Sequence, residues 1–117
     1  MCFLKNIIMT STNKPDLVDK YYERGLPQYY INFNVVQVDF DTWEHDQVRI
    51  TSDKWNYGGI VDVLIQFYYP NDKMQSVINN YLLEPDNVEF IKDFQDMQEW
   101  RKEAKKIAKE ALEYELH

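Results

Sequence analysis

Cysteine and long apolar runs are scarce in this chain of 117 residues. The single cysteine, Cys2, excludes a disulfide within the chain and a metal site built from cysteines. No apolar run approaches the roughly 18 to 20 residues that cross a bilayer as a helix, so we expect no membrane association. Lys5 and Asn6 interrupt the apolar residues between Met1 and Met9, and no small-residue cleavage site follows, so this stretch does not match a signal peptide. Met9 is an alternative start, which would make the first eight residues extraneous.

The chain also has only three glycines, too few for most phosphate-binding loops. The one pair, Gly58-Gly59, is followed by Ile60-Val61, where a P-loop would have Lys-Ser/Thr. We expect this pair to begin a helix and to allow close packing. There is no G-x-S-x-G motif, and the only serines are Ser11, Ser52 and Ser76. The sequence therefore predicts no enzyme, no cofactor and no small-molecule substrate.

Basic residues are outnumbered, with 13 Lys and Arg against 20 Asp and Glu, which gives a net charge of −7. Nucleic-acid binding needs a basic surface to contact phosphates, so no nucleic-acid partner is expected. The charge suits a soluble protein, or an acidic surface that binds a basic partner.

The longest regular pattern runs from Asp86 to Leu116 and predicts a long helix resembling a coiled coil. Pro85 blocks helix continuation from upstream, and Asp86 with Glu89 three residues later is typical of a capping box. Apolar residues recur at steps of three and four through Phe90, Phe94, Met97, Trp100, Ala104, Ile107, Ala111 and Tyr114.

This helix would be roughly 46 Å long, which exceeds the diameter of a globule with a radius of gyration near 13 Å. Its C-terminal half is therefore expected to project from the domain with its apolar stripe exposed. We predict a contact with a second copy or with a partner, formed by Trp100, Ala104, Ile107, Ala111 and Tyr114.

A basic stripe lies beside the apolar one and covers about 140° of the helix circumference. Two interpretations stay open. The stripe could contact an acidic partner surface, or it could be a solvated face that complements the helix dipole. Its members are Arg101, Lys102, Lys105, Lys106 and Lys109.

The rest of the chain predicts an α+β fold, with a small antiparallel sheet followed by three helices. Apolar and polar residues alternate from Ile31 to Phe40, with a switch of face at Val35-Val36 that indicates a β-bulge, and a second strand covers 47–51. The bulge is expected to bring both apolar sets to one side. The run 60–69 fits a strand or a helix, and we favour the helix because Pro70 ends it. Residues 72–83 form a second helical pattern.

Residues 1–28 are expected to form an N-terminal arm outside a single domain at 29–117. The stretch from Asp16 to Arg24 could form a short helix that ends at Gly25.

Acidic residues cluster around the turn between the two strands, and carboxylates spaced in this way can bind a hard cation. The EF-hand pattern fails, because the loop has no glycine and Ile50 stands where a ligating Glu would be needed. We therefore expect a solvated acidic turn and no metal at Asp39, Asp41, Glu44, His45 and Asp46.

Two segments resemble a group of small proteins from phages and prophages of Bacteroides-type gut bacteria. One runs from Trp55-Asn56-Tyr57 through Asp72-Lys73-Met74-Gln75 to Tyr81-Leu82. The other is the run from Phe94 to Glu110. The resemblance covers about half of the chain and carries no catalytic motif.

The resemblance implies a non-enzymatic structural or assembly protein of the virion, such as a tail or baseplate component. Its expected partners are itself or other phage virion proteins, and its expected location is the virion or the host cytoplasm. The alternative is a small acidic regulatory binder, such as a host-defence inhibitor.

Overall fold

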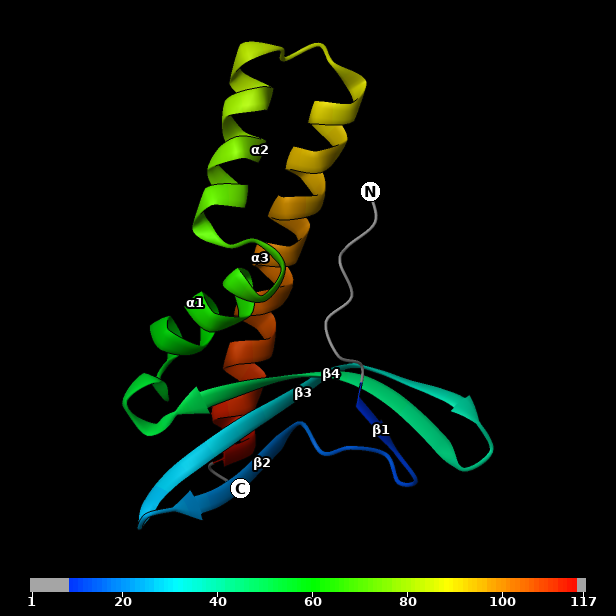
Figure 1. The fold of residues 1–117 in the computed structure, drawn as a ribbon, viewed down its shortest axis with the longest axis vertical. Helices are drawn as coiled ribbons and strands as arrows, with labels where there is room; N and C mark the ends of the chain where they lie inside the picture. The colour runs from blue at the N-terminus through cyan, green and yellow to red at the C-terminus, as the bar shows by residue number, and fades with distance from the viewer. Residues whose placement is uncertain (1–8, 116–117) are drawn as a thin grey trace.

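The computed structural model describes residues 9–115, in which a four-stranded sheet is followed by three helices (Figure 1). The α+β class and the long final helix are confirmed. Residues 1–8 and 116–117 lie outside the described residues, and with them the question of the start at Met1 or Met9. The elements are β1 (Met9–Ser11), β2 (Val18–Glu23), β3 (Leu26–Asp39), β4 (Thr42–Thr51), the 3-10 helix η1 (Ser52–Lys54), α1 (Tyr57–Tyr68), α2 (Asn71–Leu83) and α3 (Val88–Glu115).

All strands pair antiparallel in the order β1-β4-β3-β2. The predicted β3–β4 hairpin is confirmed, but residues 9–28 do not form an arm outside the domain, since β1 and β2 are the two edges of the same sheet. The short helix that 16–24 could have formed is absent, because Val18–Glu23 form the strand β2. Arg24 (φ 54°) and Gly25 (φ 80°) join Glu23 to its partner Leu26, and positive φ at both loop residues is typical of a type I′ hairpin turn. Gly25 therefore serves a strand turn and does not end a helix.

The core lies between one face of the sheet and the helices α1 and α3. Ile31, Phe33 and Ile50 are buried on the sheet side. Ile60 and Leu64 of α1 are fully buried against them. The matching face of α3 is rich in alanine, which lets the helix backbone come close to its neighbours, and consists of Met97, Trp100, Ala104, Ile107, Ala108 and Ala111.

The part of the molecule that projects from the sheet is the α2–α3 pair. Figure 1 shows α2 and the N-terminal half of α3 standing away from the sheet, while the C-terminal half of α3 lies beside it. Tyr81 of α2 stacks on Phe94 of α3 with ring centroids 4.4 Å apart. The radius of gyration of 16.2 Å is accordingly larger than the 13 Å or so expected of a compact chain of this length.

Local sequence explains where the helices begin. The Asn56 side chain accepts a hydrogen bond from the Gly59 backbone N–H at 2.8 Å, which caps α1. The helical interpretations of 60–69 and 72–83 are confirmed by α1 and α2. The capping prediction for the last helix is off by one residue, because Asn87 and not Asp86 accepts from the N–H groups of Glu89 and Phe90.

Gly59 is required where η1 meets α1. A Cβ at Gly59 would collide with the backbone carbonyl of Lys54, whereas a Cβ at Gly58 would meet nothing closer than the Asn56 side chain at 3.8 Å. We expect Gly59→Ala to lower the free energy of unfolding by about 1–3 kcal/mol, as overpacking does. The matched change Gly58→Ala should leave it unchanged or raise it by up to about 1 kcal/mol, because alanine favours helix. Urea unfolding measures both, and equal effects would contradict the close approach at Gly59.

Candidate interaction surfaces

A β-bulge divides the β3–β4 hairpin into a covered part and an exposed part. The pairing register shifts between Phe33 and Val36, as the change of face at Val35-Val36 predicts. Asn34 has a φ of 53°, a left-handed conformation that asparagine tolerates better than most residues. The bulge is therefore a defined feature of the strand that redirects the chain beyond it.

Side-chain hydrogen bonds hold this bulge to α1. The Asn34 amide donates to a carboxylate oxygen of Asp46 at 2.8 Å and to the Tyr68 hydroxyl at 2.9 Å. The Tyr68 hydroxyl donates to the same oxygen of Asp46 at 2.6 Å. Burial and this bond to Asp46 raise the pKa of Tyr68, so the phenol stays protonated and keeps donating. The last residue of α1 thereby fixes the base of the hairpin.

Beyond the bulge, the hairpin extends past the helices (Figure 1). We call residues 36–44 the hairpin tip. The bulge brings Val36 to the same side of the strand as Phe33, as the sequence predicted. Their partners on β4, Glu44 and Asp46, are two residues apart and therefore face the same side. Beyond the bulge, however, this side is not covered. Val36 and Val38 are about half exposed, and Phe40, which lies in the turn, is 92% exposed. The first set packs on the helices, while the second set has no helix opposite it.

The hairpin tip is acidic as well as apolar. It carries Asp39, Asp41 and Glu44, and no Lys or Arg occurs anywhere between Arg24 and Arg49. Asp39 accepts a hydrogen bond from the Phe40 backbone N–H at 2.7 Å, and Asp41 accepts one from the Thr42 hydroxyl at 3.2 Å. These local bonds shape the turn without neutralising its charge. One lysine lies near the tip, since the Nζ of Lys14 is 5.9 Å from the centroid of the Trp43 ring. With three carboxylates against this lysine, the hairpin tip combines exposed apolar side chains with a local excess of negative charge.

The residues predicted to form an exposed interface on the last helix are mostly in the core. Trp100 is 9% exposed, Ile107 is 5% exposed, and Ala104 and Ala111 are fully buried. The expectation that this stripe projects from the domain is wrong, because α1 and the sheet, with β2 as its edge strand, cover it. Tyr114 alone is exposed, at 42%, and its role in a contact stays a prediction.

The basic stripe, in contrast, faces solvent on the opposite side of α3. Four of its five members are exposed, and Arg101 is half-buried. Lys102 makes a long contact of 3.8 Å with Glu99, and both side chains are largely exposed, so this pair is weak. The other exposed members, Lys105, Lys106 and Lys109, form no ion pair with a described residue.

The acidic cluster around the hairpin turn does not converge on one point. Asp46 points toward α1, while its neighbour His45 lies on the other face of the sheet, since adjacent residues of a strand face opposite sides. Burial lowers the pKa of His45, against the opposing effect of Asp19 and Asp46, and its Nδ1 has no hydrogen-bond partner among residues 9–115. Within those residues no group of three or more His, Cys, Asp or Glu side chains could hold a metal ion.

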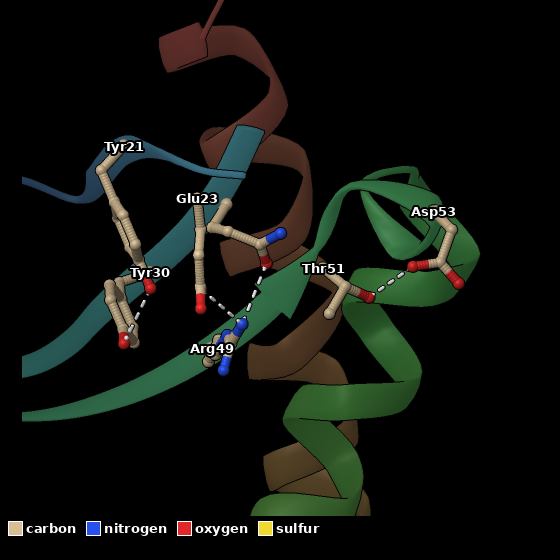
Figure 2. Close-up of polar contacts among 7 residues, drawn as sticks. Tyr21, Glu23, Tyr30, Arg49, Thr51 and Asp53 are labelled. Carbon is tan, nitrogen blue, oxygen red and sulfur yellow. Dashed lines mark hydrogen bonds and ion pairs between the residues drawn. The ribbon is translucent and has the colours of Figure 1, made fainter. Parts of the chain in front are cut away.

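The face of the sheet away from the helices is polar, and many of its side chains pair with one another. Figure 2 shows Arg49 of β4 reaching Glu23 of β2, at 3.1 Å, with a longer contact to Gln28 of 3.4 Å. The Tyr21 hydroxyl donates to the Tyr30 hydroxyl at 3.0 Å, which raises the pKa of Tyr21. These contacts join β2, β3 and β4 and explain why a short edge strand such as β2 stays on the sheet.

An open groove of about 610 Å³ runs between β4 and α1. Asp62 and Gln66 on its α1 side are hydrogen-bonded to each other at 3.0 Å. Its lining contains no serine, cysteine or histidine and consists of Gln47, Val48, Arg49, Lys54, Asp62, Val63, Gln66 and Phe67. Its lining therefore contains no Ser–His or Cys–His pair of the kind used in acyl transfer.

No protein-family model, curated protein or solved structure matches this chain. In the part of the chain that the structure describes, no helix is both long and apolar enough to span a membrane. The surfaces themselves are thus the available guide to function.

Sequence reasoning missed the apolar residues of the hairpin tip as surface residues. A signal was present, since Phe40 stands between Asp39 and Asp41 in a turn, where a core aromatic is rare. Alternation identifies the apolar face of a strand, but it does not say whether another element covers that face. The alternation over 36–39 is therefore compatible with a buried face and with an exposed one.

Proposed function

We propose that this protein is a non-enzymatic phage structural or assembly protein, associated with the virion or its tail, that acts through protein–protein contacts. Its partners would be further copies of itself or other virion proteins, in the virion or the host cytoplasm. The observation that carries the proposal is the hairpin tip, with Phe40 92% exposed above a base fixed by Asn34, Asp46 and Tyr68. The resemblance of 54–83 and 90–112 to phage and prophage proteins supports the assignment to a phage.

An exposed aromatic on a fixed hairpin suits recognition for energetic reasons. Burying a side chain of this size contributes about 1.5–3 kcal/mol, which the isolated chain does not gain from Phe40. Because the base of the hairpin is held by hydrogen bonds, little conformational entropy would be lost when the tip binds. Aromatic residues in such positions are typical anchors of protein contacts.

We expect Phe40→Ser to remove the protein from purified phage particles without unfolding it. Phe40 makes few contacts, so the free energy of unfolding should change by less than about 0.5 kcal/mol. Mass spectrometry of particles carrying the wild-type or the variant chain measures incorporation.

Leu83→Ser is the matched control, since Leu83 is 79% exposed at the α2–α3 end of the molecule. That variant should still be incorporated. Absence of the wild-type protein from particles would contradict the proposal, and equal incorporation of wild type and Phe40→Ser would rule out the hairpin tip as the contact.

A regulatory binder, such as a host-defence inhibitor, is the second candidate. The observation in its favour is the absence of Lys and Arg between Arg24 and Arg49, which gives the hairpin a negative surface suited to a basic target. Gene position separates the two functions. A place among tail and capsid genes supports the virion protein, and a place among early genes supports the inhibitor.

A further inference from the structure

This molecule carries two surfaces of opposite charge that it does not pair with each other. One is the hairpin tip, and the other is the basic stripe on α3. Asp39, Asp41 and Glu44 form no ion pair with any described residue, and the same holds for Lys105, Lys106 and Lys109.

We propose that the hairpin tip of one copy binds the basic stripe of a second copy. The inference rests on the proposed function, in that it takes protein–protein contact as the way the chain works, and it names the occupant of the hairpin tip. A second copy fits because the complementary surface is present on the chain itself. The stripe holds five of the chain's 13 basic residues, against one acidic residue, Glu113, within the same arc.

The apolar part of the hairpin tip also has a counterpart on α3. At about 100° per residue, Leu112 falls within the arc of the basic stripe, between Arg101 and Lys105. Leu112 is half-buried and therefore still presents part of its side chain. The methylene groups of the flanking lysines add apolar surface. Phe40 can thus lie on Leu112 and the lysine stems while Asp39 and Asp41 meet the ammonium groups.

Such a contact joins two different surfaces, so it is heterologous. Heterologous contacts generate a closed ring when the rotation between successive copies returns to the first copy, and an open chain of copies when it does not. The stripe lies on the side of α3 away from the core, and the hairpin tip extends past the helices, so both surfaces of one copy can be occupied at the same time (Figure 1). This arrangement suits a component that is repeated in an assembly.

Charge reversal tests the contact. Asp39→Lys with Asp41→Lys reverses the hairpin tip, and Lys105→Glu with Lys106→Glu reverses the stripe. Each double variant alone should self-associate at least tenfold more weakly than wild type in sedimentation velocity at low salt. An equimolar mixture of the two should regain association, because the reversed tip meets the reversed stripe and the two unchanged surfaces also meet.

Glu84→Lys with Asp86→Lys is the control for the tip variant, since it makes the same change in net charge at the α2–α3 turn, where both residues are exposed. It should associate as wild type does. Raising the salt concentration should weaken association of the wild type, because exposed charges are screened.

A wild-type chain that stays monomeric at high micromolar concentration and low salt would overturn the inference, and so would a mixture that fails to regain association. If copies stay monomeric while Phe40→Ser still removes the protein from particles, this inference fails and the proposed function stands. If copies associate through these surfaces but the protein is absent from particles, the proposed function fails and this contact stands.

Discussion

A chain that ends at Arg101 should not fold. The deleted segment contains Ala104, Ile107, Ala108 and Ala111, all buried in the core that α3 shares with α1 and the sheet. Losing Ile107 alone would cost about 2–5 kcal/mol by the measure of large-to-small core substitutions. The deletion also leaves the covered face of the sheet open to water. Small domains have a free energy of unfolding of only about 5–15 kcal/mol. The loss of these core side chains together with the exposure of the sheet face exceeds that value.

Near-ultraviolet circular dichroism and urea unfolding measure this loss. The truncated chain should show no fixed aromatic signal and no cooperative unfolding transition. A chain that ends at Glu113 is the control and should unfold as the full chain does, because Tyr114 is 42% exposed and contributes little to the core. A cooperative transition of the chain ending at Arg101 would mean that the C-terminal half of α3 is dispensable for the fold.

The sequence pattern predicted the helices well and the surroundings of the last one badly. Periodicity identified the apolar face of α3 that the structure buries, and Asn56, Pro70 and Asn87 immediately precede α1, α2 and α3 respectively. The same periodicity cannot say which element covers a face. The projection of the C-terminal half was predicted from the length of the helix against the size of the domain. The segment 1–28 was expected to lie outside the domain, yet its strand β2 belongs to the sheet that packs near α3.

The wrong expectation for the N-terminal segment comes from an ambiguous signal at Gly25. Gly25 is consistent with the end of a helix and with a hairpin turn, and the short polar stretch before it has no strong periodicity of either kind. Only the pairing of Val18 with Ile31 across the turn settles the choice, and that pairing depends on residues distant in sequence. With β2 in place, the sheet is wide enough to cover Ala104 and Ala111.

The exposed hairpin tip was missed for a related reason. The sequence showed the bulge, but the number of residues that the helices cover depends on where α1 and α3 cross the sheet. Tyr68 reaches Asp46 and Asn34, which marks the last covered position along the hairpin. Everything beyond it has the alternation of a half-buried strand without a partner for its apolar side.

Trp100→Ala should be the most damaging single substitution in α3. The indole lies at the centre of the core, with ring centroids 4.7 Å from Tyr68 and 5.6 Å from Phe33. Its Nε1–H donates to the Leu64 carbonyl at 2.8 Å, which ties α3 to α1. Truncation of a buried aromatic to alanine leaves a cavity and costs about 3–5 kcal/mol. Urea unfolding at constant temperature measures the change, and the slope with denaturant should stay the same if only stability changes.

Trp100→Phe separates the hydrogen bond from the packing. Phenylalanine keeps a ring against Phe33 and Tyr68 but cannot donate to Leu64, so we expect this variant to lose clearly less stability than Trp100→Ala. The bond itself contributes about 0.5–1.5 kcal/mol, and the remainder of the loss reflects the smaller ring. A loss below about 1 kcal/mol for Trp100→Ala would mean that Trp100 is not in the core. In that case the apolar face of α3 would again be available as the contact surface that its sequence pattern first indicated.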